Sequence, residues 1–365
     1  MRVDRFASTN FRNLLEGEIP FGPGLNVLVG DNGQGKTNLL EAVYFFRFGR
    51  SFRAQVDTEL IRFDAPFCRV ELACTFADGR REDFAFSIER REGRAAKAIK
   101  VNGELLPRRG DLAGRFPAVL FGPHDLRIVS GEPENRRRFL DTIGIMTDPG
   151  YLRTATKYRR VVEQRNAALK ARASRDEMAA WNDRLIELGA DFILRRRALT
   201  TAMEREMRAQ ASDLQSPFDF VMRYDSDLLA DTEDAASLTR AFQDTLASIA
   251  SEEYRRGVTL AGPHRDDVEL VMDGHDLRRF GSQGQRRLLA VLLKLAETSY
   301  LENELREPCV LLLDDVFSEF DEAIIAKLHR FLDGSRQVFV TSPANLASDA
   351  RARVHRVWAG RISSA

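Results

Sequence analysis

The sequence has few cysteines, no long apolar run and no excess of either charge. Its three cysteines, Cys68, Cys74 and Cys309, are odd in number and lack metal-ligand spacing, which argues against a disulfide scaffold or a zinc site. No 18 consecutive apolar residues occur, and the first residues lack the apolar stretch of a signal peptide. Lys plus Arg and Asp plus Glu both number 55, so a uniformly basic DNA coat is excluded. These absences predict a reduced, globular, cytoplasmic protein without a membrane partner.

Strand and helix signals divide the 365 residues into three parts. Residues 1–132 and 256–365 alternate short apolar strands, turns and helices, and the pairs Asp78-Gly79 and Asn102-Gly103 predict two hairpins. Residues 133–255 are poor in Pro and Gly over most of their length and are typical of long helices. We therefore predict an α/β core built from both chain ends, with a mainly helical arm domain inserted between them.

The inserted segment carries its charge unevenly. Residues 150–212 contain 14 Lys and Arg against 8 Asp and Glu, whereas residues 213–254 contain 10 acidic against 2 basic residues. One interpretation is that these are ordinary solvated helix faces. The other is a basic edge that binds a polyanion and an acidic edge that repels it.

A glycine-rich loop, GDNGQGKT at residues 30–37, fits the pattern G-x-x-x-x-G-K-[ST] between an apolar strand and a helix. This composition would produce the pattern by chance in roughly three chains per thousand. In such loops backbone N–H groups surround a phosphate, the lysine reaches the β- and γ-phosphates, and the Thr hydroxyl binds Mg²⁺. We predict ATP and Mg²⁺ as ligands, with Thr37 on the metal. The predicted nucleotide contacts are Gly30, Asp31, Asn32, Gly33, Gln34, Gly35, Lys36, Thr37 and Asn38.

Two carboxylates follow the apolar strand VLLL at residues 310–313. Ligands bind at the carboxyl ends of strands in open α/β sheets. We predict that Asp314 supports Mg²⁺ and that Asp315 orients or deprotonates an attacking water. With Lys36, these two residues form the core of the predicted catalytic set.

The segment Ser282-Gln283-Gly284-Gln285 precedes a long apolar helical pattern. Ser282 with Gln285 three residues later is a capping-box pattern, so a capped helix is the simpler interpretation. The functional alternative is a helix N-terminus that offers the Ser282 hydroxyl and the Gly284 backbone to a γ-phosphate held by a second subunit. In that case Ser282 joins the catalytic set.

Together these motifs resemble an ABC-type P-loop ATPase head of the SMC class, and their finer pattern resembles the RecF family of DNA replication and repair proteins. No zipper-length coiled coil is present. The matching stretches are NFRN (10–13), GDNGQGKTNLLEAVY (30–44), GRSFR (49–53), FGPHDL (121–126), GEPENRRRFLD (131–141), EQRNAALK (163–170), GPHRDD (262–267) and SQGQRRLL (282–289).

The resemblance implies an ATP-dependent homodimer that clamps double-stranded and gapped DNA in recombinational repair, fork restart and the SOS response. It implies RecR as a partner, with RecO and RecA further along. Ser282, Gly284 and Gln285 would contact the γ-phosphate bound by the other subunit, and Arg12 would approach the nucleotide. Asp321 would lie at the dimer seam. Asp315 stands where many ABC ATPases have Glu, which implies slow hydrolysis.

DNA contact is predicted for a set of arginines in the first part of the inserted segment, although a salt-bridged helix face is the better explanation for any single one of them. The candidates are Arg136, Arg137, Arg138, Arg159, Arg160 and Arg165. Two other functions stay open. A transporter-type ATPase subunit predicts a membrane partner and no DNA response, and a nucleotide-gated scaffold predicts ATP binding with almost no hydrolysis.

Overall fold

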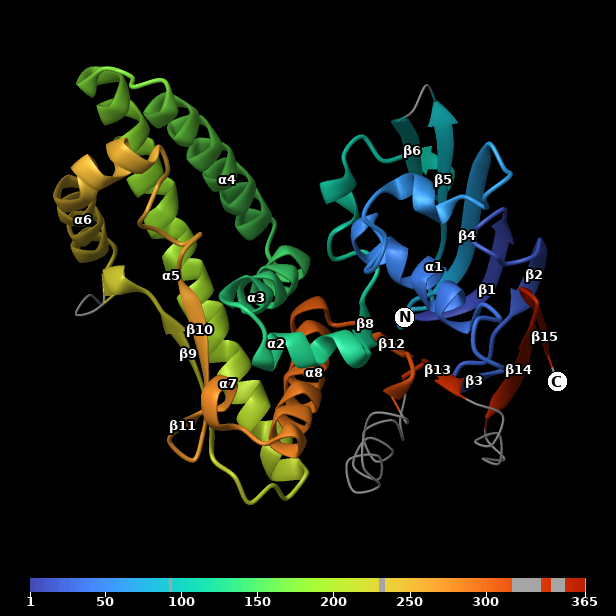
Figure 1. Ribbon diagram of the computed structural model, residues 1–365. Coiled ribbons are helices and arrows are strands. Elements are labelled where there is room, and N and C mark those ends of the chain that lie inside the picture. The colour runs from blue at the N-terminus through green and yellow to red at the C-terminus, as the bar shows by residue number, and fades with distance from the viewer. Residues whose placement is uncertain (92–93, 230–233, 317–335, 343–351, 365) are drawn as a thin grey trace. The chain divides into compact units, whose positions relative to one another are not determined.

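The computed structural model describes residues 1–91, 94–229, 234–316, 336–342 and 352–364, and it divides into two compact units (Figure 1). Unit 1 joins Met1–Asp125 to Glu297–Ala365, and unit 2 is Leu126–Ala296. A central insertion between two halves of one head was predicted, with boundaries at 132 and 255. The insertion is present, but as a compact unit it continues to residue 296 and includes the Ser282 motif.

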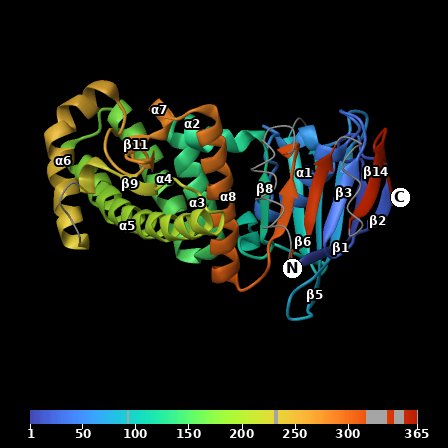
Figure 2. The same cartoon turned by 90° about the horizontal axis from the view of Figure 1, so that it is seen from below.

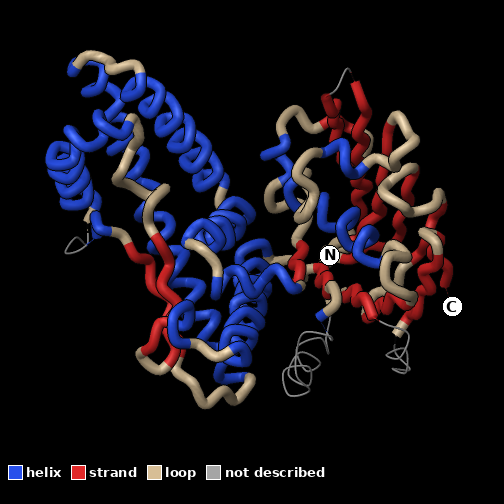
Figure 3. Tube along the Cα trace, in the orientation of Figure 1, coloured by secondary structure: helices blue, strands red, loops and turns tan. Residues whose placement is uncertain are grey.

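Within the described residues, unit 1 contains two six-stranded sheets, drawn red in Figure 3. The first has the order β15-β14-β3-β13-β12-β8 and is parallel except for its β14–β15 edge, and Figure 2 shows several of its strands side by side. Its strands are β3 (Leu25–Val29), β8 (Ala118–Phe121), β12 (Val310–Leu313), β13 (Val338–Ser342), β14 (Arg353–Trp358) and β15 (Arg361–Ser364). Because parallel strands end at one edge, the residues after β3 and β12 lie at the same edge.

The second sheet of unit 1 is antiparallel and has the order β2-β1-β4-β5-β6-β7. Its strands are β1 (Arg2–Thr9), β2 (Gly17–Pro20), β4 (Phe67–Thr75), β5 (Arg81–Arg91), β6 (Arg94–Val101) and β7 (Glu104–Leu105). The short 3₁₀ helices of this unit are η1 (Asp57–Leu60), η2 (Arg109–Leu112) and η3 (Pro123–Asp125). The predicted hairpins are confirmed, since β4 pairs with β5 and β6 pairs with β7.

Helix α1 (Lys36–Phe48) shares one apolar core with both sheets. Its buried Phe46 lies 6.0 Å, centroid to centroid, from Phe84 of the antiparallel sheet. The same core includes Leu312 and Phe339 of the parallel sheet. Truncating a buried Phe costs about 3–5 kcal/mol, so this packing fixes the axis of α1. The first turn of the helix is thereby held next to the loop that follows β3.

Unit 2 is mainly helical. Its helices are α2 (Leu126–Ser130), α3 (Pro133–Thr147), α4 (Pro149–Lys170), α5 (Arg175–Asp213), η4 (Asp227–Leu229), α6 (Ala235–Arg256), α7 (Leu277–Phe280) and the first part of α8 (Gln283–Leu305). A small antiparallel sheet joins β9 (Phe220–Asp225), β10 (Asp267–Met272) and β11 (His275–Asp276). No helix among the described residues is both long and apolar enough to cross a bilayer.

Buried arginines tie the loop at 258–266 to the long helices of unit 2. Arg165 of α4 donates to the Thr259 hydroxyl at 3.0 Å and pairs with Glu253 of α6 at 2.6 Å. Arg196 of α5 donates to the carbonyl of Pro263 at 2.5 Å. Removing one partner of a buried pair leaves an uncompensated charge, so these contacts fix α4, α5 and α6 around the loop.

Candidate nucleotide-binding site

Glycine is required at two positions of the 30–37 loop because neighbouring atoms leave no room for a side chain. A Cβ on Gly30 would lie 2.2 Å from the carbonyl oxygen of Val357. Gly35 has a φ of +116°, and a Cβ there would lie 2.9 Å from Asn13 Oδ1. Gly35 is also the N-cap of α1 and provides no side-chain cap. The first N–H groups of the helix are therefore left for a ligand, and anions are favoured at such an end.

Lys36 lies across this loop. Its Nζ donates to the carbonyls of Gly30 at 2.6 Å and Asp31 at 3.1 Å, and the residue is 6% exposed. The backbone thus holds the ammonium above the phosphate-binding turn. A buried cation among inward-facing N–H groups fits a polyphosphate.

Thr37 and Asp314 lie together at the carboxyl edge of the parallel sheet. The Thr37 hydroxyl donates to Asp314 Oδ1 at 2.8 Å, and the Thr341 hydroxyl approaches the same oxygen at 3.1 Å. Burial and the neighbouring charge of Asp315 raise the pKa of Asp314, and the hydrogen bonds from Thr37 and Thr341 only partly offset this. A buried carboxylate whose ionised form is disfavoured, beside a hydroxyl, suits a divalent cation. Hydroxyl and carboxylate oxygens are the ligands that Mg²⁺ prefers.

Asp315 follows in a left-handed backbone conformation, with a φ of +49°. Its N–H donates to Thr341 Oγ1 at 2.8 Å. Thr341 therefore accepts from one of the paired carboxylate residues and donates to the other. Residue 341 belongs to β13, which lies beside β12, so its place in the site depends on strand pairing rather than on sequence proximity.

Arg12 and Arg53 converge on one buried carboxylate beside the loop. Arg12 contacts both oxygens of Glu41 at 2.9 and 3.0 Å, and Arg53 donates to it at 2.6 Å. Burial raises the pKa of Glu41, but hydrogen bonds from Arg12, Arg53 and Ser51 outweigh it and leave the pKa below its ordinary value. The paired charges hold both guanidinium groups next to the N-terminal half of α1.

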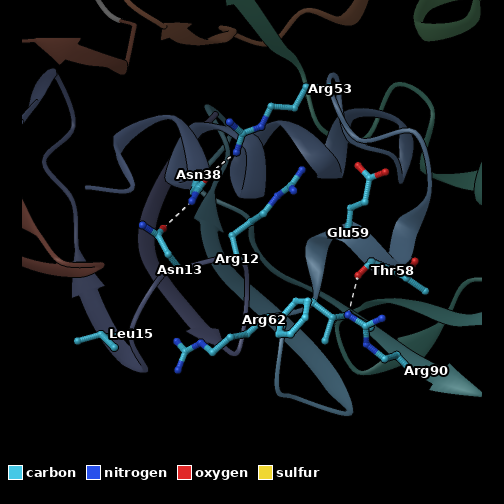
Figure 4. Close-up of a pocket in the computed structure, with 11 residues that line it drawn as sticks. Arg12, Asn13, Leu15, Asn38, Arg53, Thr58, Glu59, Arg62 and Arg90 are labelled. Carbon is cyan, nitrogen blue, oxygen red and sulfur yellow. Dashed lines mark hydrogen bonds between the residues drawn. The ribbon is translucent and has the colours of Figure 1, made fainter. Parts of the chain in front are cut away.

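A pocket of about 1120 Å³ opens beside this cluster (Figure 4). Asn38, Asn13 and Arg53 form a hydrogen-bonded chain along it, and Asn13 also donates to the carbonyl of Gly33 at 3.1 Å. The pocket therefore adjoins the phosphate loop. Phe63, which is 92% exposed, also lines it. Its basic residues are Arg12, Arg53, Arg62 and Arg90.

The Ser282 motif caps α8 in unit 2. Gln285 donates from its N–H to Ser282 Oγ at 3.2 Å, and Ser282 donates from its N–H to Gln285 Oε1 at 2.8 Å. The capping-box interpretation is thus correct as local structure. Ser282 and Gly284 are also exposed, and a Cβ on Gly284 would meet nothing within 4 Å. The cap leaves the backbone of this turn accessible to a partner.

The arginines predicted to contact DNA divide into two groups. Four are engaged by other groups of unit 2, and Arg159 and Arg160 are exposed on α4. The engaged side chains are Arg136 with Asp267, Arg137 with the carbonyl of Asp266, Arg138 with Glu134, and Arg165 with Glu253. Asp321, predicted at a dimer seam, lies outside the described residues.

Sequence reasoning missed several groups of the site. Thr341 bridges the two carboxylates, Asn13 holds the loop, and Glu41 collects Arg12 and Arg53. The only signal for Asn13 and Arg53 was their position in the matching stretches NFRN and GRSFR. For Glu41 no chemical pattern distinguishes it from other helical acids.

Comparison with known proteins identifies the family of this chain. The family model described as "RecF/RecN/SMC N terminal domain" matches residues 2–361. The chain belongs to the RecF family. It is 38% identical to the DNA replication and repair protein RecF of Geobacter sulfurreducens over 344 residues, which cover 94% of this chain and 93% of that protein. It is 33% identical to RecF of Bacillus subtilis, with the same coverage.

Solved structures extend the similarity of this RecF-family chain to the fold. A structure titled "recombination mediator protein RecF-ATP in RecFOR pathway" superposes with a TM-score of 0.91 at 30% identity, covering 100% of this chain and 99% of that one. The Smc head of Pyrococcus furiosus superposes with a TM-score of 0.56 at 15% identity, which shows a shared fold. The predicted mixed α/β ABC-type head with a helical insertion is confirmed.

Proposed function

We propose that this RecF-family chain binds and slowly hydrolyses ATP, and that ATP joins two copies into a clamp on DNA at gaps and stalled forks. The observation that carries the proposal is the Thr37–Asp314 hydrogen bond beside the buried Lys36. It brings the two predicted halves of a phosphate and metal site together across 277 positions of sequence. A relative of the same fold is titled as a RecF–ATP complex.

The hydrolytic step would be an in-line attack of water on the γ-phosphate. Lys36 neutralises charge on the transferred group, and Asp315 orients the water and accepts its proton. Thr37 and Asp314 would hold Mg²⁺, which supplies further positive charge to the β- and γ-phosphates. Since Asp315 has a shorter side chain than Glu, it holds the water less closely, and we expect slow turnover.

A second copy would complete each site with its signature turn. The exposed Ser282 hydroxyl accepts from Gln285, so its own hydrogen can be donated to a γ-phosphate oxygen. Helix α8 has 23 residues, and its N-terminus carries a partial positive charge. ATP binding would then stabilise the dimer, and ATP hydrolysis would open it.

The nucleoside end of ATP would occupy the pocket beside Asn13 and Asn38. This pocket adjoins the carbonyl of Gly33, so a nucleotide with its phosphates in the loop reaches it directly. The ring of Phe63 offers a surface for the base. Arg12 and Arg53 add positive charge where the pocket meets the loop.

The partners follow from the family and are part of the proposal. Double-stranded and gapped DNA would be the polyanion, RecR would bind the clamp, and RecO and RecA would act after it in the cytoplasm. The full-length similarity to RecF proteins supports this over a transporter subunit. The nucleotide-gated scaffold stays a second candidate because Asp315 is the shorter carboxylate.

The first experiment is ATP turnover per subunit against protein concentration, with and without duplex DNA at fixed low salt. A rate that rises with protein concentration, and rises further with DNA, supports composite sites in a DNA-stimulated dimer. A measurable rate that is flat in both overturns the clamp. ATP binding without turnover favours the scaffold.

A further inference from the structure

The exposed cations of helix α4 and the turn after it lack carboxylate partners. Residues 149–175 contain eight Lys and Arg but one acid, Glu163. Arg165 is buried, and the other seven cations are exposed: Arg153, Lys157, Arg159, Arg160, Lys170, Arg172 and Arg175. In the described part of the chain, none of these seven side chains has a nitrogen atom within 4.0 Å of a carboxylate oxygen, so none forms an ion pair.

Other helices of unit 2 present a different pattern. On α5, Arg184 pairs with Glu187 and Arg195 pairs with Asp191. On α6, a single carboxylate, Glu252, collects both Arg255 and Arg256. The pairing partners lie three or four residues away, at the spacing that neighbours on a helix require. The sequence of α4 provides almost none, so its surface charge is uncompensated.

Four polar residues of α4 form a line along one side of the helix. Arg153, Lys157, Arg160 and Gln164 follow the spacing i, i+4, i+7 and i+11, and all four are exposed. They span about 17 Å of helix axis at 1.5 Å per residue. Duplex DNA carries about one phosphate charge per 1.7 Å of its axis, so a duplex alongside this line presents roughly ten phosphates.

Aromatic side chains are absent from the exposed face of residues 149–175, all of which the structure describes. Tyr151 and Tyr158 are each 2% exposed, and both point into unit 2. Proteins that bind single strands usually stack bases on exposed aromatic rings. The face is therefore suited to phosphates rather than to unpaired bases, which favours a duplex.

The inward face of α4 is anchored, which keeps the outer cations on a fixed scaffold. Tyr158 contacts His264 at 2.7 Å, Thr154 donates to Asp191 at 2.6 Å, and Arg165 pairs with Glu253. At 3.6 residues per turn, these anchors lie roughly 110° around the helix axis from the exposed line, so the line borders the buried side of the helix. An ordered helix loses less entropy on binding than a loop with the same charges.

We propose that the exposed face of α4, and above all Arg153, Lys157 and Arg160, contacts the phosphates of duplex DNA. Such a surface binds the sugar-phosphate backbone of the DNA and does not recognise its base sequence. This rests on the proposed function, which supplies DNA as the polyanion. It places the contact on residues that sequence reasoning had largely left out. Of the arginines predicted from sequence, it retains Arg159 and Arg160.

The test compares two full-length variants that each lose three positive charges from unit 2. The first is Arg153→Gln, Lys157→Gln and Arg160→Gln. The matched control is Arg184→Gln, Arg255→Gln and Arg256→Gln, whose arginines are exposed but paired. Binding to a 30-base-pair duplex is measured with ATP at several salt concentrations. Circular dichroism and the protection of amides in α4 from exchange establish that both variants are folded.

We expect the α4 variant to bind the duplex at least tenfold more weakly at low salt. Its slope of log affinity against log salt should be shallower by about three, one unit for each lost phosphate contact. The control should keep the wild-type slope. Equal losses in both variants, or an unchanged slope in the α4 variant, overturn the inference.

The outcome for the wild-type chain separates this inference from the proposed function. If the wild type binds duplex in an ATP-dependent way and the α4 variant binds equally well, the clamp stands and the contact lies elsewhere. If the wild type binds no duplex in any nucleotide state, the proposed function is wrong, and the inference about α4 falls with it. A single strand that competes as well as the duplex at equal phosphate concentration overturns the preference for a duplex.

Discussion

The hydroxyl of Thr37 donates a 2.8 Å hydrogen bond to Asp314 Oδ1, although the two residues are 277 positions apart. Thr37 lies in the first turn of α1, the helix that comes after β3, and Asp314 directly follows β12, with β13 between these two strands. Three parallel strands thus bring a helix turn and a carboxylate to one edge. The bond joins the loop at 30–37 to the end of the strand that we propose supports Mg²⁺.

Removing the hydroxyl of Thr37 or the charge of Asp314 should weaken the effect of Mg²⁺ on nucleotide affinity. Thr37→Ala deletes a proposed metal ligand, whereas Thr37→Ser keeps the hydroxyl. We expect the gain in ATP affinity from Mg²⁺ over EDTA to shrink about tenfold in Thr37→Ala and Asp314→Asn, a change of about 1.4 kcal/mol, and to persist in Thr37→Ser. Equilibrium titration of a fluorescent ATP analogue measures it. Equal Mg²⁺ responses in Ala and Ser variants would place the metal elsewhere.

Asp314→Asn should also raise the thermal stability of the nucleotide-free protein in EDTA, or leave it unchanged. Burial raises the pKa of Asp314, which means that its charged form is disfavoured in the folded state. A neutral amide removes that cost at pH 7. A clear fall in melting temperature, measured by calorimetry, would show that the carboxylate stabilises the fold instead.

Asp315→Asn should slow ATP turnover about a hundredfold or more while ATP binding and dimerisation persist. The amide cannot accept the proton of the attacking water, and general-base contributions are typically of this size. DNA complexes formed with ATP should then dissociate more slowly after a chase with unlabelled DNA. The matched control is Asp78→Asn, which keeps a favourable Asn-Gly turn in the β4–β5 hairpin. Wild-type turnover in Asp315→Asn contradicts the assigned role.

Local sequence patterns predicted those parts of the site that are formed by residues close together in the sequence. The loop at 30–37 and the carboxylates at 314–315 each depend on a short run of residues after a strand. The same is true of the turns at Gly79 and Gly103, whose φ angles of +84° and +81° only glycine adopts without strain. In each case the chemistry and its backbone geometry are encoded within about ten residues.

Contacts between distant segments could not be predicted in this way. Thr341 reaches Asp314 because β13 pairs with β12, and a sequence does not state strand order. Residues 267–272 belong to the second unit because β10 pairs with β9, whereas the composition changes near 255. Arg136 and Arg165 resemble surface arginines in sequence, yet both are buried, and they pair with Asp267 and Glu253.

Phe63 should contribute to nucleotide binding through the base. An exposed aromatic ring at the pocket can stack on adenine, and such stacking is worth about 1–3 kcal/mol. We expect Phe63→Ala to weaken ATP binding roughly five- to hundredfold. Binding of inorganic tripolyphosphate should be unchanged, because it lacks a base. Leu105→Ala, which shortens another exposed apolar residue of unit 1, is the control. Equal losses for ATP and tripolyphosphate would mean that Phe63 shapes the loop rather than the base pocket.

His264 should make unit 2 less stable as the solution is acidified. Its Nε2 lies 3.1 Å from the carbonyl of Thr259, which can only accept, so Nε2 donates; in the neutral ring Nδ1 then accepts from the Tyr158 hydroxyl at 2.7 Å. This arrangement requires a neutral ring. Burial first, then the charges of Arg265, Arg137 and Arg165, lower the pKa of His264 to about 4.

The direction of the pH effect follows from that pKa. Between about pH 6.5 and pH 4 the unfolded chain binds a proton at His264 that the folded chain does not, so stability is complete above pH 6.5 and falls towards pH 4. The total contribution is at most about 3 kcal/mol. Because the chain has two units, hydrogen exchange of peptides from residues 151–170 and 258–266, corrected for intrinsic rates, is the suitable measurement.

His264→Gln isolates the titration from the hydrogen bonds. An amide can accept from Tyr158 and donate to the Thr259 carbonyl, but it binds no proton in this range. We expect this variant to lose most of the pH dependence of protection while keeping its protection at pH 7.5. His275→Gln, on the exposed strand β11, should retain the wild-type pH dependence. If His264→Gln loses protection equally at pH 5 and pH 7.5, the ring acts by packing, and its neutral state does not control the stability of the loop.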